Sequence, residues 1–335
     1  MLRIGSFGGF GFCDILPLPI SAGKTSISAA ESAVGGLKMA TIEAVPNFSE
    51  GRNEEVINAI RDAAASVDGV KVLDVQSDSD HNRMVLTLAG DVEPVMEGVM
   101  NAARVAIEKI DLRQHQGEHR RMGAVDVAPF VPVSGIKKKE LKARVEQFAE
   151  EFAKNFDVPV YLYYDSAKQD NRVTLPDIRE GEFEGFAEKI KLPEWKPDFG
   201  PDKVHETAGC TAIGIRPFLI AFNVNLDTDD VKIAKAIAKA VRGSSGGYAT
   251  IQGAGFMLED QGVAQVSMNF LDYKKTSIYR VVETIKSEAA RHGVDIAGCE
   301  LVGAAPMEAF LQCAEFYLRM IDPLEDHMIE KKIWG

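Results

Sequence analysis

The sequence predicts an α+β protein in which a β-α-β-β-α-β unit occurs twice in tandem. Two observations lead to this prediction. Segments with strand-like apolar patterns are interspersed with segments whose apolar residues recur every three or four positions, as in amphipathic helices. The order of these segments over residues 41–133 recurs over residues 218–306, without obvious sequence identity between the two halves. This order is the split βαβ arrangement of ferredoxin-like subdomains.

Six elements make up the first unit. They are a strand at 41–48, a helix at 53–67, strands at 70–77 and 82–90, a helix at 91–110 and a strand at 124–133. Asn53 and Asp91 are the expected N-caps of the two helices, and Pro94 suits the first turn of the second one. A further helix at 137–156 and a strand at 158–164 extend this unit.

The second unit repeats the pattern. Its elements are a strand at 218–226, a helix at 229–242, strands at 250–258 and 263–272, a helix at 277–292, a strand at 298–306 and an added helix at 307–320. We expect two open sheets, each covered by helices on one face. Residues 175–209 are rich in Pro, Gly and charge and are longer than an ordinary connection, so we expect them to line a site.

The expected domain organisation has four parts. They are an N-terminal extension at 1–39, a first subdomain with its linker at 40–208, a second subdomain at 209–324 and a tail at 325–335. The extension is Gly- and Ser-rich, lacks helical periodicity and is interrupted by Pro17 and Pro19, so it is expected to be disordered. It is either an organellar targeting segment or the product of a start assigned upstream of Met39; a signal peptide would need an unbroken apolar stretch.

Composition excludes several classes of protein. No run of 18 apolar residues occurs, which argues against a membrane span. The net charge of −12 argues against a broad nucleic-acid surface, so an anionic ligand would need a local basic pocket. The four cysteines are scattered and form no C-x-x-C pair, which favours a reducing, cytoplasmic location.

The stretch HQGEHRRMGAVD, residues 115–126, contains several side chains that could bind a metal ion or transfer a proton. Its start matches H-x-x-E-H, a zinc-protease signature in which two histidines share one helical face. Gly117 and Gly123 and the lack of an apolar stripe argue against a helix here, so a metal site is not expected. A histidine of near-neutral pKa in a loop can instead transfer a proton. On spacing alone, a solvated polar loop remains an alternative.

Three further polar segments have weaker functional signals. VPNFSEGRN, residues 45–53, leads into a helix N-terminus, where backbone N–H groups favour a carboxylate, although a plain helix cap is the alternative. SDSDHNR, residues 77–83, is interpreted as a turn between strands. RGSSGGYATIQGAG, residues 242–255, has neither a P-loop lysine nor an ordered G-x-G-x-x-G, so nucleotide binding is not indicated.

Several longer motifs occur in one order along the chain. They are VPNFSEGRN, GEHRRMGAVDVAPFVPV, VPVYLYY, EWKPDFGP and FLIAFNVNL. With these motifs the sequence resembles the formiminotransferase domain of the formimidoyltransferase-cyclodeaminases, the glutamate formimidoyltransferase family, from residue 41 to about residue 324. The resemblance implies two ferredoxin-like subdomains with a folate channel between them. It also implies transfer of the formimino group of N-formimino-L-glutamate to N5 of tetrahydrofolate, a co-substrate, in histidine degradation.

The resemblance also implies site residues. The family's G-E-H-P-R-M-G-A motif stands here as GEHRRMGA, which makes His119 the expected catalytic residue, and Asn47 and Arg121 match motif residues expected to bind substrate. Arg120 joins them because both substrates carry carboxylates. The family's folate segment follows D-F-G-P and corresponds to Gly200, Pro201, Asp202, Lys203, Val204, His205, Glu206, Thr207, Ala208 and Gly209.

Some features depart from the family pattern. Arg120 replaces the proline of the catalytic motif, and SDSDHNR is longer and more acidic than in the family. A fused cyclodeaminase domain is not recognised, so a separate cyclodeaminase is an expected partner; a homodimer is expected from the resemblance. Two other interpretations remain open: a folate-binding paralogue, inactive or using a different formyl or formimino donor, and a zinc hydrolase using His115 and His119.

Overall fold

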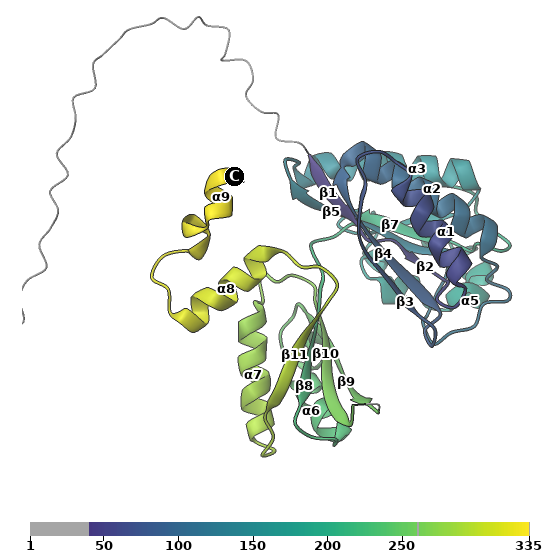
Figure 1. Ribbon diagram of the computed structural model, residues 1–335. Helices are drawn as coiled ribbons and strands as arrows, with labels where there is room; N and C mark the ends of the chain where they lie inside the picture. Colours follow the sequence, from purple (N-terminus) through teal and green to yellow (C-terminus); the bar gives the residue numbers. More distant parts are fainter. Residues whose placement is uncertain (1–39, 260, 335) are drawn as a thin grey trace, which may run out of the picture. The chain divides into compact units, whose positions relative to one another are not determined.

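The computed structural model describes residues 40–259 and 261–334. The expected extension at residues 1–39 therefore lies outside the described residues. The described residues belong to one compact unit, which contains two β-sheets (Figure 1). Within these residues, no helix combines the length and the apolar character needed to cross a membrane.

The first sheet has seven strands. They are β1 (Thr41–Ala44), β2 (Asn47–Phe48), β3 (Lys71–Asp78), β4 (Arg83–Asp91), β5 (Val125–Ser134), β6 (Val160–Tyr164) and β7 (Thr211–Ile215). Both β1 and β2 pair antiparallel with β4 on one side and with β5 on the other, and β3 pairs with the far edge of β4. These pairings give the predicted split βαβ order. The sheet then continues beyond β5 through β7 and β6, which run parallel to it.

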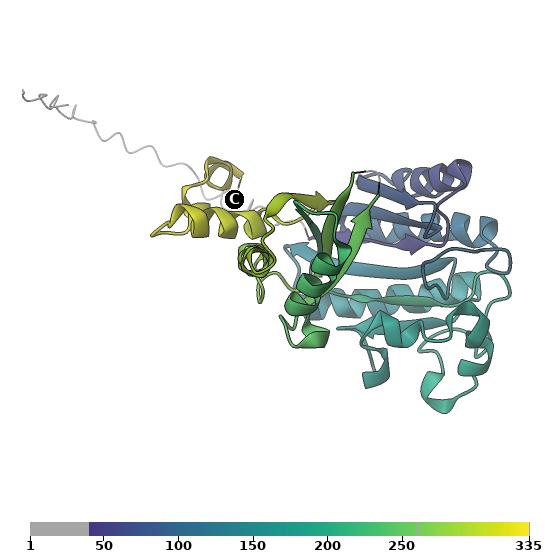
Figure 2. The ribbon, with the colours of Figure 1, turned by 90° about the horizontal axis from the view of Figure 1, so that it is seen from below.

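The second sheet has four antiparallel strands in the order β11-β8-β10-β9. They are β8 (Ile220–Leu226), β9 (Ile251–Leu258), β10 (Val263–Phe270) and β11 (Ile296–Val302). Helices α6 (Val231–Val241) and α7 (Ile278–Ala290) supply apolar residues to the core on one face of this sheet (Figure 2). The second β-α-β-β-α-β unit is thus confirmed as a ferredoxin-like subdomain.

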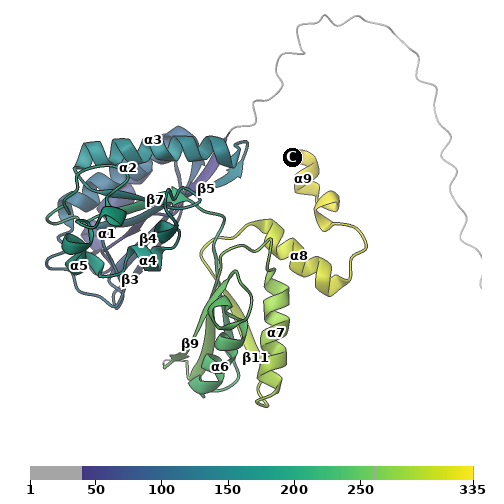
Figure 3. The ribbon, with the colours of Figure 1, turned by 180° about the vertical axis from the view of Figure 1, so that it is seen from behind.

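The first sheet is covered on both faces over part of its width. Helices α1 (Glu54–Ala65), α2 (Val92–Lys109) and α3 (Lys138–Phe156) pack on one face (Figure 1), whereas the view from behind shows α4 (Leu175–Ile178) and α5 (Glu182–Lys189) on the other (Figure 3). Strand β6 shows why. Leu162 belongs to the core under α3, while Tyr161 and Tyr163 alternate with it and contribute to the core that includes Ile178 and Phe186. The expectation of one covered face was therefore wrong for this sheet.

Two elements differ from the sequence prediction at strand level. The strand predicted at 41–48 is divided into β1 and β2, because Pro46 lacks the N–H needed to continue the ladder; its carbonyl still accepts from Leu86 N at 3.0 Å. Strand β7 was missed, since its five residues are all buried and show no alternation. As β7 belongs to the first sheet, that sheet extends past the expected subdomain boundary at 208/209.

The capping predictions had different outcomes. Asn53 caps α1 as predicted, and its side-chain oxygen accepts from the backbone N–H groups of Glu55 and Val56. Asp91 occupies the N-cap position of α2, but its side chain makes no capping hydrogen bond. The remaining elements of the described residues are η1 (Asp170–Arg172), η2 (Pro193–Trp195), η3 (Gly243–Ser245), α8 (Met307–Leu318), η4 (Leu324–His327) and α9 (Ile329–Trp334).

Candidate active site

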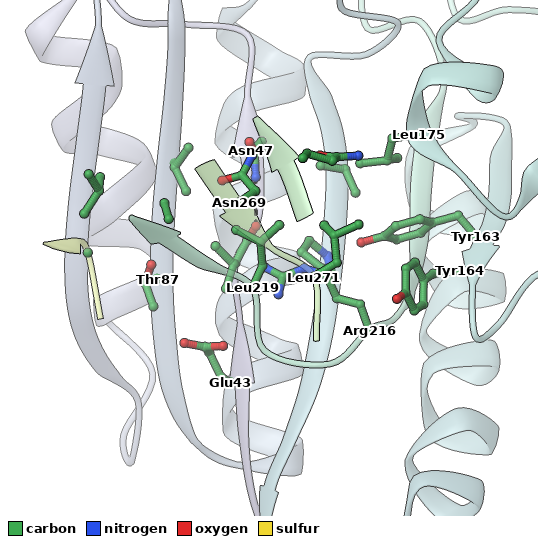
Figure 4. Close-up of a pocket in the computed structure, with 18 of the residues that line it drawn as sticks. Glu43, Asn47, Thr87, Tyr163, Tyr164, Leu175, Arg216, Leu219, Asn269 and Leu271 are labelled. Carbon is green, nitrogen blue, oxygen red and sulfur yellow. Dashed lines mark hydrogen bonds between the residues drawn. The ribbon is translucent and has the colours of Figure 1, made fainter. Parts of the chain in front are cut away.

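A pocket of about 440 Å³ is lined by residues of both sheets (Figure 4). From the first sheet come side chains on the face opposite α1–α3, including Glu43 and Thr87, together with Tyr163 and Tyr164 at the end of β6. The second sheet contributes Asn269 on the face opposite α6 and α7, among others. Because both sheets leave these faces free of their main helices, polar and apolar side chains can meet there around a ligand.

Three arginines, Arg83, Arg179 and Arg216, give the pocket a local positive charge, against the two acidic residues Glu43 and Asp74. Burial lowers the pKa of Arg83, and the like charge of Arg179 lowers it further. Such close cations are stabilised when an anion binds between them. This is the local basic pocket that an anionic ligand would need in a chain of net charge −12.

Arg179 is held by a buried carboxylate. Its Nε donates to Oδ2 of Asp126 at 2.9 Å, and its Nη2 donates to the same oxygen. The Asp126 side chain is 1% exposed, and its other oxygen accepts from the backbone N–H of Met122 at 2.9 Å. Asp126 therefore ties the pocket arginine to the end of the loop that contains His119.

His119 lies in a loop, as predicted, and not on a helix. His115 and His119 therefore do not share a helical face, which the zinc-protease signature requires. Within the described residues, no group of three or more His, Cys, Asp and Glu side chains is arranged to hold a metal ion.

The surroundings of His119 keep its imidazole neutral. Burial lowers the pKa of His119 to about 4; the charge of Asp126 opposes this shift, and those of Arg179 and Arg83 reinforce it. His119 is only partly buried, so its ring remains accessible. His119 is not among the residues that line the pocket, but two arginines that do line it, Arg83 and Arg179, act on its pKa. The neutral imidazole is the protonation state that accepts a proton.

Hydrogen bonds connect the loop that contains His119 to the turn between β3 and β4. His115 Nε2 bonds to the carbonyl of Asn82 at 2.8 Å, Asn82 Nδ2 donates to the carbonyl of Gln116 at 3.0 Å, and Glu118 N donates to the carbonyl of Asp80 at 3.1 Å. At Gly117, a Cβ would lie 2.3 Å from a backbone oxygen of that turn, so only glycine fits. The SDSDHNR segment, interpreted as a plain turn, thus supports the His119 loop.

The predicted substrate-binding residues lie in different places. Asn47 lines the pocket, and its side-chain nitrogen donates to the carbonyl of Val45 at 2.9 Å. Arg120 is exposed on the loop and does not line the pocket.

Arg121 is not among the residues that line the pocket, so its expected substrate contact stays a prediction. Its guanidinium is 8% exposed and donates to both carboxylate oxygens of Glu184, at 2.6 and 2.8 Å, and to Glu182 at 3.3 Å. Its Nε also donates to Nδ1 of His115 at 3.2 Å, and its carbonyl accepts from Phe183 N at 3.0 Å. Arg121 therefore anchors the His119 loop to the start of α5.

Replacing Arg121 by Met is expected to lower the free energy of unfolding by about 1–3 kcal/mol, because buried hydrogen bonds to charged groups are lost. The turnover number should fall more than folate affinity, since the loop carrying His119 loses its anchor. Denaturant unfolding and steady-state kinetics would check both effects. Glu184→Gln, which keeps one acceptor on an exposed side chain, is the milder control; an Arg121→Met protein with full turnover would contradict the anchoring role.

The predicted folate segment, Gly200 to Gly209, forms a tight turn within the first subdomain. His205 Nδ1 accepts from Thr207 N and Ala208 N at 3.3 and 3.0 Å, and Gly209 bridges to Gly123 of the His119 loop. None of its ten residues lines the pocket. It precedes β7, so it does not connect the two sheets as expected; its contact with folate stays a prediction.

Sequence reasoning missed four residues that shape the pocket: Arg83, Arg179, Arg216 and Tyr163. Arg83 ended a segment interpreted as a turn, and Arg179 lay in the long segment expected to line a site. Tyr163 was assigned to a buried strand. A signal that could have identified Arg83 is its place at the start of the strand predicted at 82–90, since side chains at strand ends often face a ligand. Arg216 follows β7, which was not predicted, so it had no such signal.

Comparisons with known proteins agree with this architecture. A family model described as the formiminotransferase domain, N-terminal subdomain, matches residues 41–216, and one described as the formiminotransferase domain matches residues 221–333. The glutamate formimidoyltransferase of Streptococcus pyogenes serotype M1 is 47% identical over 294 residues, covering 86% of this chain and 98% of that protein.

Two further relatives extend the comparison. The glutamate formimidoyltransferase of Thermoplasma acidophilum is 42% identical over 297 residues, covering 88% of this chain and 98% of its own length. The formimidoyltransferase-cyclodeaminase of Rattus norvegicus is 44% identical over 281 residues, which cover 82% of this chain but 52% of the rat protein. The chain therefore belongs to the formiminotransferase family.

Proposed function

We propose that this protein is a glutamate formimidoyltransferase, which transfers the formimino group of N-formimino-L-glutamate to N5 of tetrahydrofolate in histidine degradation. The observation that carries this proposal is a neutral histidine whose pKa is lowered in part by two of the three arginines that line the pocket. Both substrates carry glutamate carboxylates, for which arginine is well suited, and the transfer needs a group that moves a proton.

The pocket suits a folate in size and chemistry. Its volume of about 440 Å³ lies within the usual range for small-molecule sites. Apolar side chains, among them Val85, Val127, Leu219 and Leu271, can pack against flat aromatic rings, while Arg83, Arg179 and Arg216 can hold carboxylates. Binding both reactants in one pocket would supply much of the rate by proximity.

His119 is the proposed catalytic residue. The N5 amine attacks the formimino carbon, and a tetrahedral intermediate forms. His119 accepts the proton that N5 loses and returns it to the nitrogen of glutamate, which then leaves with the electrons of the broken C–N bond. Such acid–base catalysis contributes roughly 10²- to 10⁴-fold.

The acid limb of kcat/KM should lie at low pH because burial, reinforced by the charges of Arg179 and Arg83, lowers the pKa of His119. Its neutral form is the active base, so activity is present above its pKa of about 4 and lost as pH falls through it. Since Arg179 lowers this pKa, Arg179→Gln should move the acid limb to higher pH, whatever it does to the absolute rate. Profiles of kcat/KM for both proteins would check this; an unmoved limb, or a shift to lower pH, would contradict the assignment.

Lys203→Ala tests the predicted folate segment. If Gly200–Gly209 contacts folate, this change should weaken tetrahydrofolate binding more than it slows saturated turnover, because a charge contact is lost in both the ground and the transition state. Calorimetric titration would measure the affinity, with Lys154→Ala on α3 as an exposed control. An affinity equal to that of the parent protein would limit this segment to supporting the His119 loop.

The proposed function itself is tested by assaying purified protein with tetrahydrofolate and several donors. Formiminoglutamate should give 5-formiminotetrahydrofolate, and a formylated analogue or formiminoglycine should give little product. Tight folate binding without transfer from any donor would favour the alternative of a folate-binding paralogue. From the family resemblance we also propose a cytoplasmic homodimer, with a separate cyclodeaminase releasing ammonia from the product.

A further inference from the structure

The hydroxyl group of Tyr163 is buried in the wall of the pocket without a hydrogen-bond partner among the described residues. Tyr163 is 2% exposed, and Figure 4 shows its hydroxyl end pointing into the pocket. The other buried side-chain atoms without partners belong to Asn171, Arg172 and Thr211, none of which lines the pocket. Buried polar groups are rarely left unpaired, so this one calls for an explanation in terms of a ligand.

The neighbours of Tyr163 determine which ligand group would suit it. Burial raises the pKa of Tyr163 to about 12, against the opposing charges of Arg216 and Arg179 and the hydrogen-bonding influence of the Arg216 guanidinium on the hydroxyl oxygen. The hydroxyl therefore keeps its proton at neutral pH, and that proton has no acceptor among the described residues. Guanidinium groups only donate hydrogen bonds, so neither arginine can accept that proton. The missing partner is therefore an acceptor, and the positive charges favour a negatively charged one.

The protein holds Tyr163 firmly in this position. Strand β6 is fixed by its parallel pairing with β7, and Tyr161, two residues earlier, packs at 0% exposure on the same face with its hydroxyl bonded to the carbonyl of Trp195 at 2.7 Å. The Tyr163 hydroxyl is thus presented to the pocket with its position set before any ligand binds.

We propose that the Tyr163 hydroxyl and the Arg216 guanidinium together bind a carboxylate of one of the two substrates, which makes Tyr163 a determinant of substrate recognition. This proposal rests on the proposed function, in which both substrates carry carboxylates. The carboxylate accepts one hydrogen bond from the hydroxyl and further hydrogen bonds from the guanidinium. Hydrogen bonds to charged groups are the stronger ones, so losing one should be measurable in affinity.

Tyr163→Phe, compared with Tyr161→Phe, is the matched test. Tyr163→Phe removes a hydroxyl that has no partner in the free protein, so the melting temperature without ligand should stay the same or rise, by about 1–3 °C. Tyr161→Phe removes a hydroxyl that has a partner and leaves the partly buried carbonyl of Trp195 without it, so its melting temperature should fall. The effects on ligand affinity should be the opposite of those on the melting temperature. Tyr163→Phe should weaken carboxylate binding roughly 10-fold or more, and Tyr161→Phe should leave it unchanged.

Four ligands, measured by calorimetry and thermal shift, distinguish the source of the carboxylate. They are tetrahydrofolate, tetrahydropterin, which lacks the glutamate tail, formiminoglutamate, and glutarate as a plain dicarboxylate. A loss of affinity for tetrahydrofolate but not for tetrahydropterin assigns the carboxylate to the folate tail. A loss confined to formiminoglutamate assigns it to the donor.

Other results would contradict the carboxylate-site proposal or the proposed function on which it rests. Equal losses for tetrahydropterin and tetrahydrofolate, unchanged affinity for all four ligands, or a Tyr163→Phe protein that melts several degrees lower without ligand would each contradict it. If the parent protein binds neither substrate, yet glutarate stabilises it and not the Tyr163→Phe variant, the proposed function fails while the carboxylate site stands.

Discussion

Replacement of His119 by Ala is expected to lower the turnover number roughly 100-fold or more, while the fold and the affinity for tetrahydrofolate stay nearly intact. The physical reason is that His119 is neutral and only partly buried, and that the hydrogen bonds that hold the loop do not use its ring. The loop is held by His115, Glu118 and Arg121. Steady-state kinetics and calorimetry would separate the two effects.

Matched controls make this result specific. His292→Ala, at an exposed position after α7, should have full activity. His115→Ala should have a smaller effect than His119→Ala, because His115 only supports the loop through Asn82 and Arg121. Added imidazole should restore part of the turnover of His119→Ala. Near-parental turnover without His119, or activity abolished by a chelator and restored by zinc, would refute the proton-transfer assignment and reopen the zinc hydrolase alternative.

Asp126→Ala is expected to lower the free energy of unfolding by about 3–5 kcal/mol and to remove most activity. Its carboxylate is 1% exposed and pairs with Arg179, which is itself 15% exposed, so its loss leaves a mostly buried charge without a partner. It also leaves Met122 N without its acceptor and frees the loop that holds His119. Denaturant unfolding would measure the first effect, and turnover at saturating substrate the second.

The double variant Asp126→Asn with Arg179→Gln separates stability from activity. Its amide groups can hydrogen-bond to each other and to Met122 N without a buried charge, so it should regain most of the stability lost in Asp126→Ala. It should still be poorly active, because a cation next to His119 in the pocket is missing. A stable double variant with parental activity would show that the Asp126–Arg179 pair acts only on stability.

How much of the fold could be predicted depended on local periodicity. The helices at α2 and α7 and the β-α-β-β-α-β order of both halves were predicted because each element has its own regular apolar spacing. Strand β7 could not be recognised, since five buried residues carry no alternation. The division of the first strand at Pro46 required knowing which neighbours it pairs with.

By itself, the sequence determined the two split βαβ units, the loop conformation around His119 and, through its motifs, the family. Only the tertiary structure decided which charged groups meet. It turned Arg121 toward Glu182 and Glu184, and it brought Arg83, Arg179 and Arg216 together in one pocket. The physical reason is that the residues brought together lie far apart in the sequence: Arg83 and Arg216, which line one pocket, are 133 positions apart, and Arg179 and Arg216 are 37 apart. Strand pairing and burial set such contacts, and no local pattern encodes them.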